Sequence, residues 1–546
     1  MSTAHLDLPP TLDCPSASRV ARRGGIKSAW TTALALALLL GAQAAEAALQ
    51  DVTIVAKSGD AVPGLPPTFT FTDLRSPQIN AYGDVFFSGG LDGPGVEYSN
   101  GRVLIADPTD DSMQLIRRWG DPYPGASAPP SGGGKIVLTE DRQVYVEVVG
   151  ATNPDSADEW WTWQPSTGLT PFMREGFVTP GGELITRLDA GGLYGNRGYR
   201  VARVGGTSGE SLWTRNANGN PEVHFAAERI ILRPEGASHS GHVAAKIEIP
   251  SSSGFPAYAL ERINPDATST RVVAFDDSLP ETGLYLRNGD VIETAVNSVG
   301  DVAFLGSSGV FAGPDKLIYF YDGSSLHFIA REDDPALGTS GGTYTESFGT
   351  AFRFLQMSDW RRAAVFNATV LLPSGEPTEM IVEATATSQR IVAERGDPAP
   401  GFAASAMLTN LRRHITDSFG RVIFHSQVDT DDEALFMDQG PGRPLVALLK
   451  TGETLEVAPG DVRQISSIAG PAGDQVRFFS ISPGNVLATE VEFDDGTSAV
   501  IRAPLPPIAT SPAVVPGLSA SMILVLAAVL TSLGWASTRI LAARPC

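Results

Sequence analysis

Several groups of residues in this sequence are of the types that do chemistry, and each also has a plainer interpretation. Residues 338–342 (GTSGG) match the string that carries a nucleophilic serine in some hydrolases. That site needs a strand before the serine and a helix after it. Here the string follows Asp-Asp-Pro and precedes residues typical of strands, which indicates a flexible loop. His239 and His242 lie near a glycine turn with no third zinc ligand close in sequence, so they predict no metal site.

Calcium is a second candidate ligand, because oxygen-rich loops bind it. The acidic clusters are 107–111, 276–277, 429–433 and 494–496. None has the calcium-loop pattern with its central glycine and terminal glutamate, so solvated loops are the favoured interpretation. We therefore predict no cofactor, with calcium as the alternative.

Three indoles close together are a third chemical feature. Trp160, Trp161 and Trp163 could form an edge on which a sugar stacks, and we treat them as the candidate binding residues. The alternative, which tryptophans within a strand favour, is that they belong to a buried core.

Composition limits the possible functions. The 546 residues include 61 acids and 40 bases, for a net charge of −21. Nucleic-acid binding needs a basic surface, so this class is excluded. A hydrophobic content of 42% is enough for a large core, and 57 glycines with 40 prolines predict many turns. The two cysteines, Cys14 and Cys546, lie at the ends of the chain, so we expect no disulfide or thiolate site in its body.

The first 47 residues have the pattern of a secretory signal peptide. A basic segment ending at Lys27 precedes an apolar run over 31–42, and Ala45-Glu46-Ala47 fits the small-residue cleavage pattern. The sequence therefore predicts export, with cleavage before Ala48.

The C-terminal end predicts a membrane anchor. A proline-rich linker over 504–517 leads into residues 518–538, which carry no charge and at about 1.5 Å per residue span about 31 Å, the thickness of a bilayer core. Arg539 and Arg544 follow, which places the tail 539–546 in the cytoplasm and the body outside it. The expected location is the cell envelope, with a single transmembrane helix.

This tail resembles the PEP-CTERM and IPTL-CTERM sorting signals of exported bacterial proteins. The resemblance rests on the order of linker, Val515-Pro516-Gly517-Leu518-Ser519, apolar run and arginines. It implies a sorting protease as a partner, and release or re-anchoring of the body after the tail is processed. The sequence departs from the pattern because no glutamate flanks Pro516.

Internal repetition is the most informative feature. The string at 80–87 (NAYGDVFF) recurs at 297–304 (NSVGDVAF) and, modified, at 416–424, with weaker copies that give about eight units. A second string, Gly-Asp followed by Pro-Gly three residues later, alternates with it at 58–64, 119–125 and 395–401. Glycine after an Asn or Asp side chain is typical of tight turns. The predicted turn residues are Asn80, Gly83, Asn297, Gly300, Gly420, Gly59, Asp60, Gly120, Asp121, Gly396 and Asp397.

The segments between these turns are β-branched and aromatic, which predicts strands. The pairs Asn100-Gly101, Asn218-Gly219 and Asn288-Gly289 lie between apolar runs, as hairpin turns do. We therefore expect residues 48–503 to form an all-β tandem-repeat domain, a β-propeller of about eight blades. A linear β-solenoid is the alternative. The region begins with the second string and ends with the first, an offset that suits closure through a shared blade.

The alternating strings resemble exported bacterial proteins that carry tandem NxxGxxAF repeats and a choice of C-terminal anchors. That resemblance implies a surface location and no particular activity. We expect a structural or binding module without catalytic activity, whose partners are the membrane and a surface polysaccharide or envelope protein. The alternative is a propeller-fold glycan hydrolase or lyase whose site residues converge from different blades.

Overall fold

Each repeat unit folds into a small antiparallel sheet whose successive strands are hydrogen-bonded neighbours. The β-branched and aromatic runs form the strands, and the Gly-containing strings form the turns between them. The computed structural model describes residues 49–507, which belong to one compact unit. Within that range it omits residues 98–99, 111, 125–131, 150–157, 177, 179–181, 183, 189–199, 205–209, 216–220, 228–229, 239, 250–256, 275–276, 309–315, 347–350 and 469–478.

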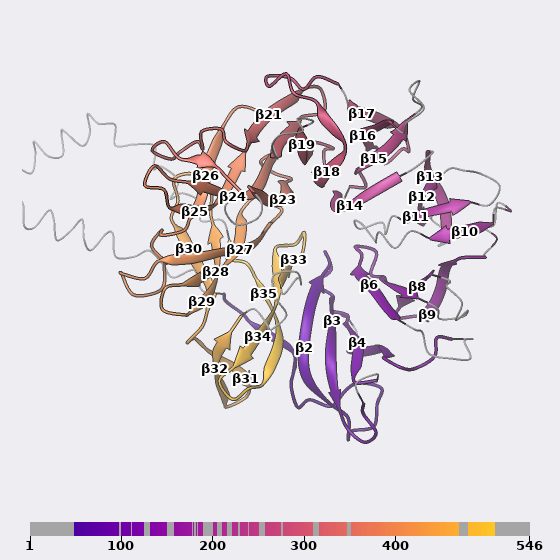
Figure 1. Ribbon diagram of the computed structural model, residues 1–546. Helices are drawn as coiled ribbons and strands as arrows, with labels where there is room; N and C mark the ends of the chain where they lie inside the picture. The colour runs from indigo at the N-terminus through magenta and orange to yellow at the C-terminus, as the bar shows by residue number, and fades with distance from the viewer. Residues whose placement is uncertain are drawn as a thin grey trace, which may run out of the picture. The chain divides into compact units, whose positions relative to one another are not determined.

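The first four sheets have four strands each, in chain order (Figure 1). Sheet 1 contains β2 (Thr70–Ile79), β3 (Val85–Asp92), β4 (Arg102–Asp107) and β5 (Gln114–Arg118). Sheet 2 contains β6 (Gly132–Leu138), β7 (Val144–Val149), β8 (Asp158–Gln164) and β9 (Gly168–Arg174). Sheet 3 contains β10 (Ile185–Leu188), β11 (Arg200–Val204), β12 (Glu210–Arg215) and β13 (Pro221–Ala227). Sheet 4 contains β14 (Ile230–Ala237), β15 (Val243–Ile249), β16 (Ala257–Ile263) and β17 (Ser269–Ala274).

The next three sheets follow the same order. Sheet 5 contains β18 (Leu286–Val296), β19 (Val302–Ser308), β20 (Lys316–Tyr321) and β21 (Leu326–Arg331). Sheet 6 contains β22 (Thr343–Tyr344), β23 (Phe352–Ser358), β24 (Ala363–Leu371), β25 (Pro377–Ala384) and β26 (Gln389–Glu394). Sheet 7 contains β27 (Leu408–Thr416), β28 (Val422–Val428), β29 (Glu433–Asp438) and β30 (Leu445–Lys450).

Sheet 8 combines the two ends of the described chain. Its C-terminal strands are β31 (Thr454–Ala458), β32 (Asp461–Ser467), β33 (Phe479–Ile481), β34 (Val486–Phe493) and β35 (Ser498–Pro504). Strand β1 (Thr53–Lys57) pairs with β35, from Thr53 opposite Arg502 to Lys57 opposite Ala499. This pairing has the form expected from the offset between the two ends of the repeat region. It fastens the start of the domain to its last sheet.

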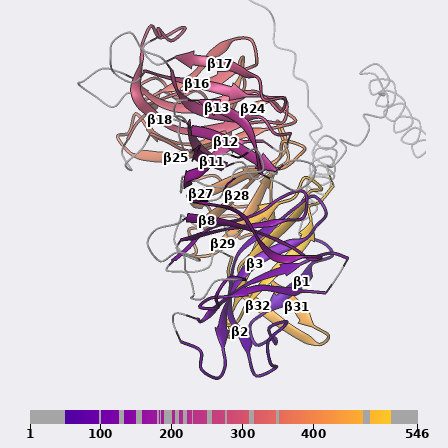
Figure 2. The same cartoon turned by 90° about the vertical axis from the view of Figure 1, so that its right-hand side faces the viewer.

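The hydrophobic core is divided among the junctions between sheets. Eight clusters of buried side chains each join two sheets that follow one another, and one of them joins sheet 8 to sheet 1. In that last cluster Ala488 and Val500 of sheet 8 pack with Phe71 of sheet 1. Figure 1 and Figure 2 show the yellow strands of sheet 8 beside the indigo strands of sheet 1. Each sheet thus buries both faces, which one sheet alone cannot do, and the fold is all-β and β-propeller-like.

No helix occurs among the described residues, and hence none there is long and apolar enough to cross a membrane. The predicted signal peptide (1–47) and transmembrane helix (518–538) lie outside the described residues.

One predicted hairpin turn is wrong. Asn288-Gly289 lies within β18, and not between two strands. The pairing of β18 with β19 shifts register there, since Leu286 pairs with Ser308 and Val291 with Gly306. Such an irregularity is a second use for a glycine between apolar runs, and the local sequence does not distinguish it from a hairpin. Asn218-Gly219 lies outside the described residues.

Candidate functional site

In sheets 1, 2, 4, 5 and 7 a short turn joins the first strand to the second, and in sheets 6 and 8 a similar turn joins β23 to β24 and β33 to β34; the corresponding segment of sheet 3 is not described. We call these turns the turn rim; they comprise residues 80–84, 139–143, 238–242, 297–301, 358–363, 417–421 and 482–486. In six of them the first N–H donates to the fifth carbonyl, as from Asn297 to Asp301 (3.1 Å), and the fourth N–H donates to the first carbonyl. The fourth residue of these six turns has a positive φ, which is 88° at Gly300 and 62° at Arg142.

The predicted Asn and Gly residues hold these turns in shape. Oδ1 of Asn297 accepts the N–H groups of Val299 (3.2 Å) and Asp301 (2.8 Å). Asn80 makes the same two contacts, and Gly83 and Gly420 have φ values of 83° and 73°. The repeated string therefore forms a capped turn with a buried first side chain.

The second string forms a different turn, which precedes the first strand of a sheet, whereas the rim turn follows that strand. Gly59, Gly120 and Gly396 have φ values of 87°, 84° and 95°. Oδ2 of Asp60 accepts the N–H of Lys57 (3.1 Å), and Oδ2 of Asp397 accepts that of Glu394 (2.8 Å). The N–H of Asp121 donates to the carbonyl of Arg118 (3.3 Å). These turns connect one sheet to the next.

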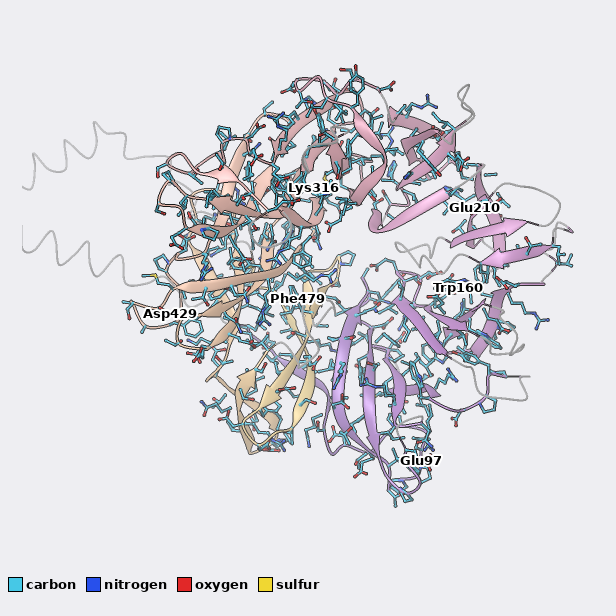
Figure 3. All side chains as sticks on the ribbon, in the orientation of Figure 1. Glu97, Trp160, Glu210, Lys316, Asp429 and Phe479 are labelled. Carbon is cyan, nitrogen blue, oxygen red and sulfur yellow. The ribbon has the colours of Figure 1, made fainter. Side chains whose placement is uncertain are left out.

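The three tryptophans proposed to stack on sugar lie in the core. Trp161 and Trp163 pack between sheets 1 and 2, and Trp160 packs between sheets 2 and 3, where Figure 3 labels it on β8. All three are buried, and Nε1 of Trp161 donates to Oε2 of Glu159 (2.9 Å). Adjacent strand residues point to opposite faces, so the indoles fill two junctions and offer no edge to a ligand.

Neighbouring turns of the rim are linked to one another. Arg142 of sheet 2 donates to both carboxylate oxygens of Asp84 in sheet 1, from Nε (2.7 Å) and Nη2 (2.9 Å). Arg362 of sheet 6 donates to both carboxylate oxygens of Asp301 in sheet 5 in the same way. Burial alone would raise the pKa of Asp84, but the hydrogen bonds from Arg142 and from the Thr109 amide outweigh it and lower the pKa.

Other rim contacts continue this chain of links. The amide (2.6 Å) and hydroxyl (2.8 Å) of Ser298 donate to Asp359 in sheet 6. The hydroxyl of Ser418 in sheet 7 donates to Asn485 in sheet 8 (3.0 Å). Ser240 of sheet 4 donates to the Ser298 carbonyl (2.6 Å). These contacts place the linked turns side by side, at the same end of their sheets.

A cavity of about 160 Å³ lies inside the rim, and we call it the rim cavity. Sheets 4 to 8 all contribute to its lining, through turns and adjoining strand ends. Its polar lining residues are Ser238, Gln356, Asp359, Thr416, Asp417, Ser418 and Ser482. Sites that enclose a drug-sized ligand measure about 300–1,000 Å³, so this cavity fits a small polar group or the tip of a larger ligand.

Both carboxylates in the cavity wall are engaged in hydrogen bonds that fix the turns. Asp359 accepts from Ser298, as described above. Oδ1 of Asp417 accepts the N–H groups of Phe419 (2.9 Å) and Arg421 (2.8 Å), and Oδ2 pairs with the Arg421 guanidinium. A general acid or base needs a lone pair or proton directed at the substrate. These two groups are suited to hold shape and to accept further hydrogen bonds.

A second group of acids lies away from the rim cavity, at the junctions of sheet 8. Burial, together with the charge of Glu492, raises the pKa of Glu490 on β34 to about 8. Burial acts in the same direction on Glu433 of β29, but the His425 imidazole 3.6 Å away and hydrogen bonds from the Ile468 amide and Ser467 lower its pKa to about 2. The junctions of sheet 8 therefore hold one carboxyl with a raised pKa, Glu490, and one with a lowered pKa, Glu433.

The other chemical candidates form no site among the residues described. No three His, Cys, Asp or Glu side chains in that part of the chain lie close enough to hold a metal. His239 is outside it, and Nδ1 of His242 lies 2.9 Å from the Ser240 hydroxyl. Residues 338–342 form a bend before β22, with the Gly342 amide donating to Thr339 Oγ1 (3.0 Å).

The rim cavity and its ionic links were missed because their residues are far apart in the sequence. The sequence did contain a signal for the ionic links. In two degenerate repeats an arginine, Arg142 or Arg362, replaces the turn glycine. The turn of the preceding repeat ends in an aspartate, Asp84 or Asp301, and this aspartate is the partner of the arginine.

Comparison with solved structures gives distant matches. A polysaccharide lyase, Uly1, is 8% identical, with 84% of this chain and 100% of that chain covered and a TM-score of 0.37. A eukaryotic initiation factor is 10% identical, with 82% and 93% covered and a TM-score of 0.39. The Pyrococcus horikoshii acylaminoacyl peptidase is 10% identical with a TM-score of 0.33; 77% of this chain is covered, but only 58% of the peptidase. Matches this distant say nothing about activity.

The sequence gives one clear assignment. No curated protein matches it significantly. A family model matches residues 43–176 and 263–500, which together are more than half of the chain and include rim turns from six sheets. The chain therefore belongs to the family of unknown function DUF7453.

Proposed function

We propose that this protein is an exported, membrane-anchored eight-bladed β-propeller that binds a polar ligand of the cell envelope without catalysing a reaction. The eight sheets would be the blades, and the pairing of β1 with β35 would close the ring. The apolar runs at 31–42 and 518–538 support export and anchoring. The proposed ligand is a surface polysaccharide or the polar surface of an envelope protein.

The observation that carries the proposal is the wall of the rim cavity. Five sheets converge there on hydroxyl, amide and carboxylate groups, and the carboxylates are already fixed by turn hydrogen bonds. Such a wall can recognise hydroxyl groups through several directed hydrogen bonds. It lacks a pair of opposed, unengaged acids among its lining residues, which glycan hydrolysis would require.

The test is ligand binding by the full-length protein in detergent micelles, screened on an array of bacterial envelope glycans. Gln356→Leu removes an amide from the cavity wall without adding volume. We expect it to weaken binding about tenfold, the value of one hydrogen bond to a neutral group. Gln464→Leu is the matched control, because Gln464 is exposed on β32 and does not line the cavity. Equal binding by both variants would refute this site.

Export and anchoring need a separate test. The mass of the form recovered from the cell envelope is expected to correspond to removal of residues 1–47. Retention of residues 518–538 would show an intact anchor, and their loss would show processing by a sorting protease. A full-length form in the cytoplasm would contradict the proposal.

A glycan hydrolase or lyase is the second candidate, and the buried acids at the junctions of sheet 8 are the observation in its favour. Glycosidases use two carboxyls whose pKa values are pushed apart, as those of Glu490 and Glu433 are. Glu490 is only 4% exposed and does not line the rim cavity, so we rank this candidate lower. Release of reducing ends or unsaturated sugars by the wild type, abolished in Glu490→Gln, would reverse that ranking.

A further inference from the structure

Large hydrophobic side chains protrude from the turn rim at a repeated position. The third residue of four rim turns is exposed: Trp360 by 73%, Tyr82 by 59%, Val299 by 57% and Phe419 by 40%. Single exposed hydrophobic residues are ordinary on protein surfaces. Recurrence at one position of a repeated turn is different, because neighbouring turns are in contact and bring the side chains onto one face.

The contacts between turns make this face continuous. A Cβ added to Gly420 would lie 2.7 Å from Ser358 Oγ and 2.8 Å from Arg361 Cγ, so the turns that carry Phe419 and Trp360 touch. Ser298 and Asp359 join the turns that carry Val299 and Trp360. The polar tips, Asp141, Ser240 and Gly484, belong to sheets 2, 4 and 8. Three successive sheets, 5 to 7, therefore present an apolar arc centred on Trp360.

The chain leaves the described domain at this same rim. The Leu505 amide donates to the Asn485 carbonyl (2.8 Å), and the Arg421 guanidinium donates to the Pro506 carbonyl. Both acceptor and donor belong to rim turns, those of sheets 8 and 7. From residue 508 to 517 an extended chain reaches at most about 35 Å. An anchor at 518–538 therefore keeps the rim close to the membrane surface.

The apolar arc is also electrically neutral in a strongly acidic protein. The turns of sheets 5 to 7 contain three aspartates and three arginines, namely Asp301, Asp359, Asp417, Arg361, Arg362 and Arg421. With a net charge of −21 over the chain, the excess acids lie elsewhere. Anionic headgroups repel acidic surfaces, so this neutral arc is the face that can approach them.

We propose that the apolar arc of the turn rim rests on the lipid headgroup layer, with Trp360 and Phe419 inserted into it and Val299 at its side. An indole ring favours the membrane interface, where one end of the ring is apolar and the other is wet. The anchor raises the local concentration of the arc at the surface, so weak insertion is sufficient. This inference rests on the proposed anchoring by residues 518–538. It orients the rim cavity toward the membrane, which favours a ligand at the lipid surface.

The test uses the full-length protein reconstituted into vesicles of phosphatidylethanolamine and phosphatidylglycerol, with and without lipids brominated near the headgroup. Bromine quenches tryptophan fluorescence on contact. We expect the brominated lipids to quench the wild type and Trp360→Ser to lose the part of the quenching that belongs to Trp360. Val462→Ser is the matched control, since Val462 is as exposed as Tyr82 but lies on β32, and it should leave quenching unchanged.

The outcomes separate this inference from the proposed function. If the wild type does not float with the vesicles, anchoring itself fails. If it floats and Trp360→Ser is quenched as much as the wild type, anchoring stands and the docking of the arc is refuted. Quenching relieved by an added soluble polysaccharide would also refute docking, because the arc would then be a sugar-stacking surface. An unchanged melting temperature of Trp360→Ser excludes misfolding as the cause of any loss.

Discussion

The junction between sheets 5 and 6 and the junction between sheets 8 and 1 solve the same packing problem with different polar chemistry. Between sheets 5 and 6, Arg362 clamps Asp301, and Asp359 accepts two hydrogen bonds from Ser298. Between sheets 8 and 1, the amides of β2 donate to hydroxyls instead, from Leu74 to Ser498 (3.2 Å) and from Ile79 to Ser480 (2.9 Å).

The titratable groups differ accordingly. Asp301 is 1% exposed and forms a salt bridge with Arg362. At the closing junction, burial and the charge of Glu492 raise the pKa of Glu490, although Arg75 opposes the shift. Even Asp107, within 3.5 Å of Arg502, has a raised pKa because burial outweighs that guanidinium. The junctions of sheets 1 with 2 and of sheets 5 with 6 are thus bridged by ion pairs at the rim, whereas burial raises the pKa of two carboxyls at the junction of the chain ends.

The largest effect is expected from Glu490→Gln at high pH. The pKa of Glu490 rises from 4.5 to about 8 on folding, so its contribution to stability is complete below pH 4.5 and is lost as pH rises through 8. At about 1.4 kcal/mol per pKa unit, the variant should be more stable than the wild type by up to about 5 kcal/mol at pH 9. Melting temperatures of both proteins between pH 5 and pH 9 measure this, and parallel curves would contradict the proposed closing chemistry.

Glu433→Gln is the control of opposite sign. The pKa of Glu433 is lowered to about 2, so its contribution is present above pH 4.5 and is lost as pH falls toward 2. This variant should therefore melt at a lower temperature than the wild type at pH 7. The charged side chains near Glu490 are Asp73 and Arg75 of sheet 1 and Glu492 of sheet 8. Their charges affect the pH range over which Glu490, and not Glu433, titrates.

Arg362→Ala tests the ionic junction. It leaves Asp301 buried without its main partner, a change that costs about 3–5 kcal/mol for fully buried pairs. Because the Arg362 side chain is 53% exposed, water replaces part of the interaction, and we expect about 2–3 kcal/mol of destabilisation at pH 7.

Arg271→Ala is the matched comparison in a pair within one sheet. The Arg271 side chain is also 53% exposed, but it reaches Glu261 at only 3.5 Å, by a single contact. Its loss should cost less than about 1 kcal/mol. Denaturant unfolding compares the two variants, and equal costs would mean that the rim pairs do not hold the sheets together.

The contrast between the junctions also shows which parts of the structure can be predicted from the sequence. The repeated strings predict turns at Gly83, Gly300 and Gly420, because a backbone position with a positive φ favours glycine and so can be recognised from a single residue. The approximate number of repeat units follows from counting the repeated strings. The wall of the rim cavity does not, since it combines residues such as Ser238 and Ser482 that only the packing of sheets brings together.

The tryptophans show the opposite limit. Three indoles within one strand indicate a large apolar surface, but the sequence does not say whether partners cover it. Sheets 1 and 3 on either side bury them. Trp360 is the reverse case: it lies in a degenerate turn, and only the structure shows that no packing covers most of its surface. Burial is a property of neighbours, which a local pattern cannot contain.

The smallest expected effect separates the cost of a turn from the cost of contact between turns. Gly300 and Gly375 have nearly equal φ values, 88° and 86°. A Cβ at Gly300 would lie 2.9 Å from Cδ2 of His242 in sheet 4, whereas nothing lies within 4 Å of one at Gly375. Both alanine variants pay about 1 kcal/mol for a left-handed backbone. Gly300→Ala must also displace the imidazole, so it should cost about 1 kcal/mol more in denaturant unfolding. Equal costs would show that the turns of sheets 4 and 5 are loosely packed, and that neighbouring rim turns are held tightly only where arginine bridges them.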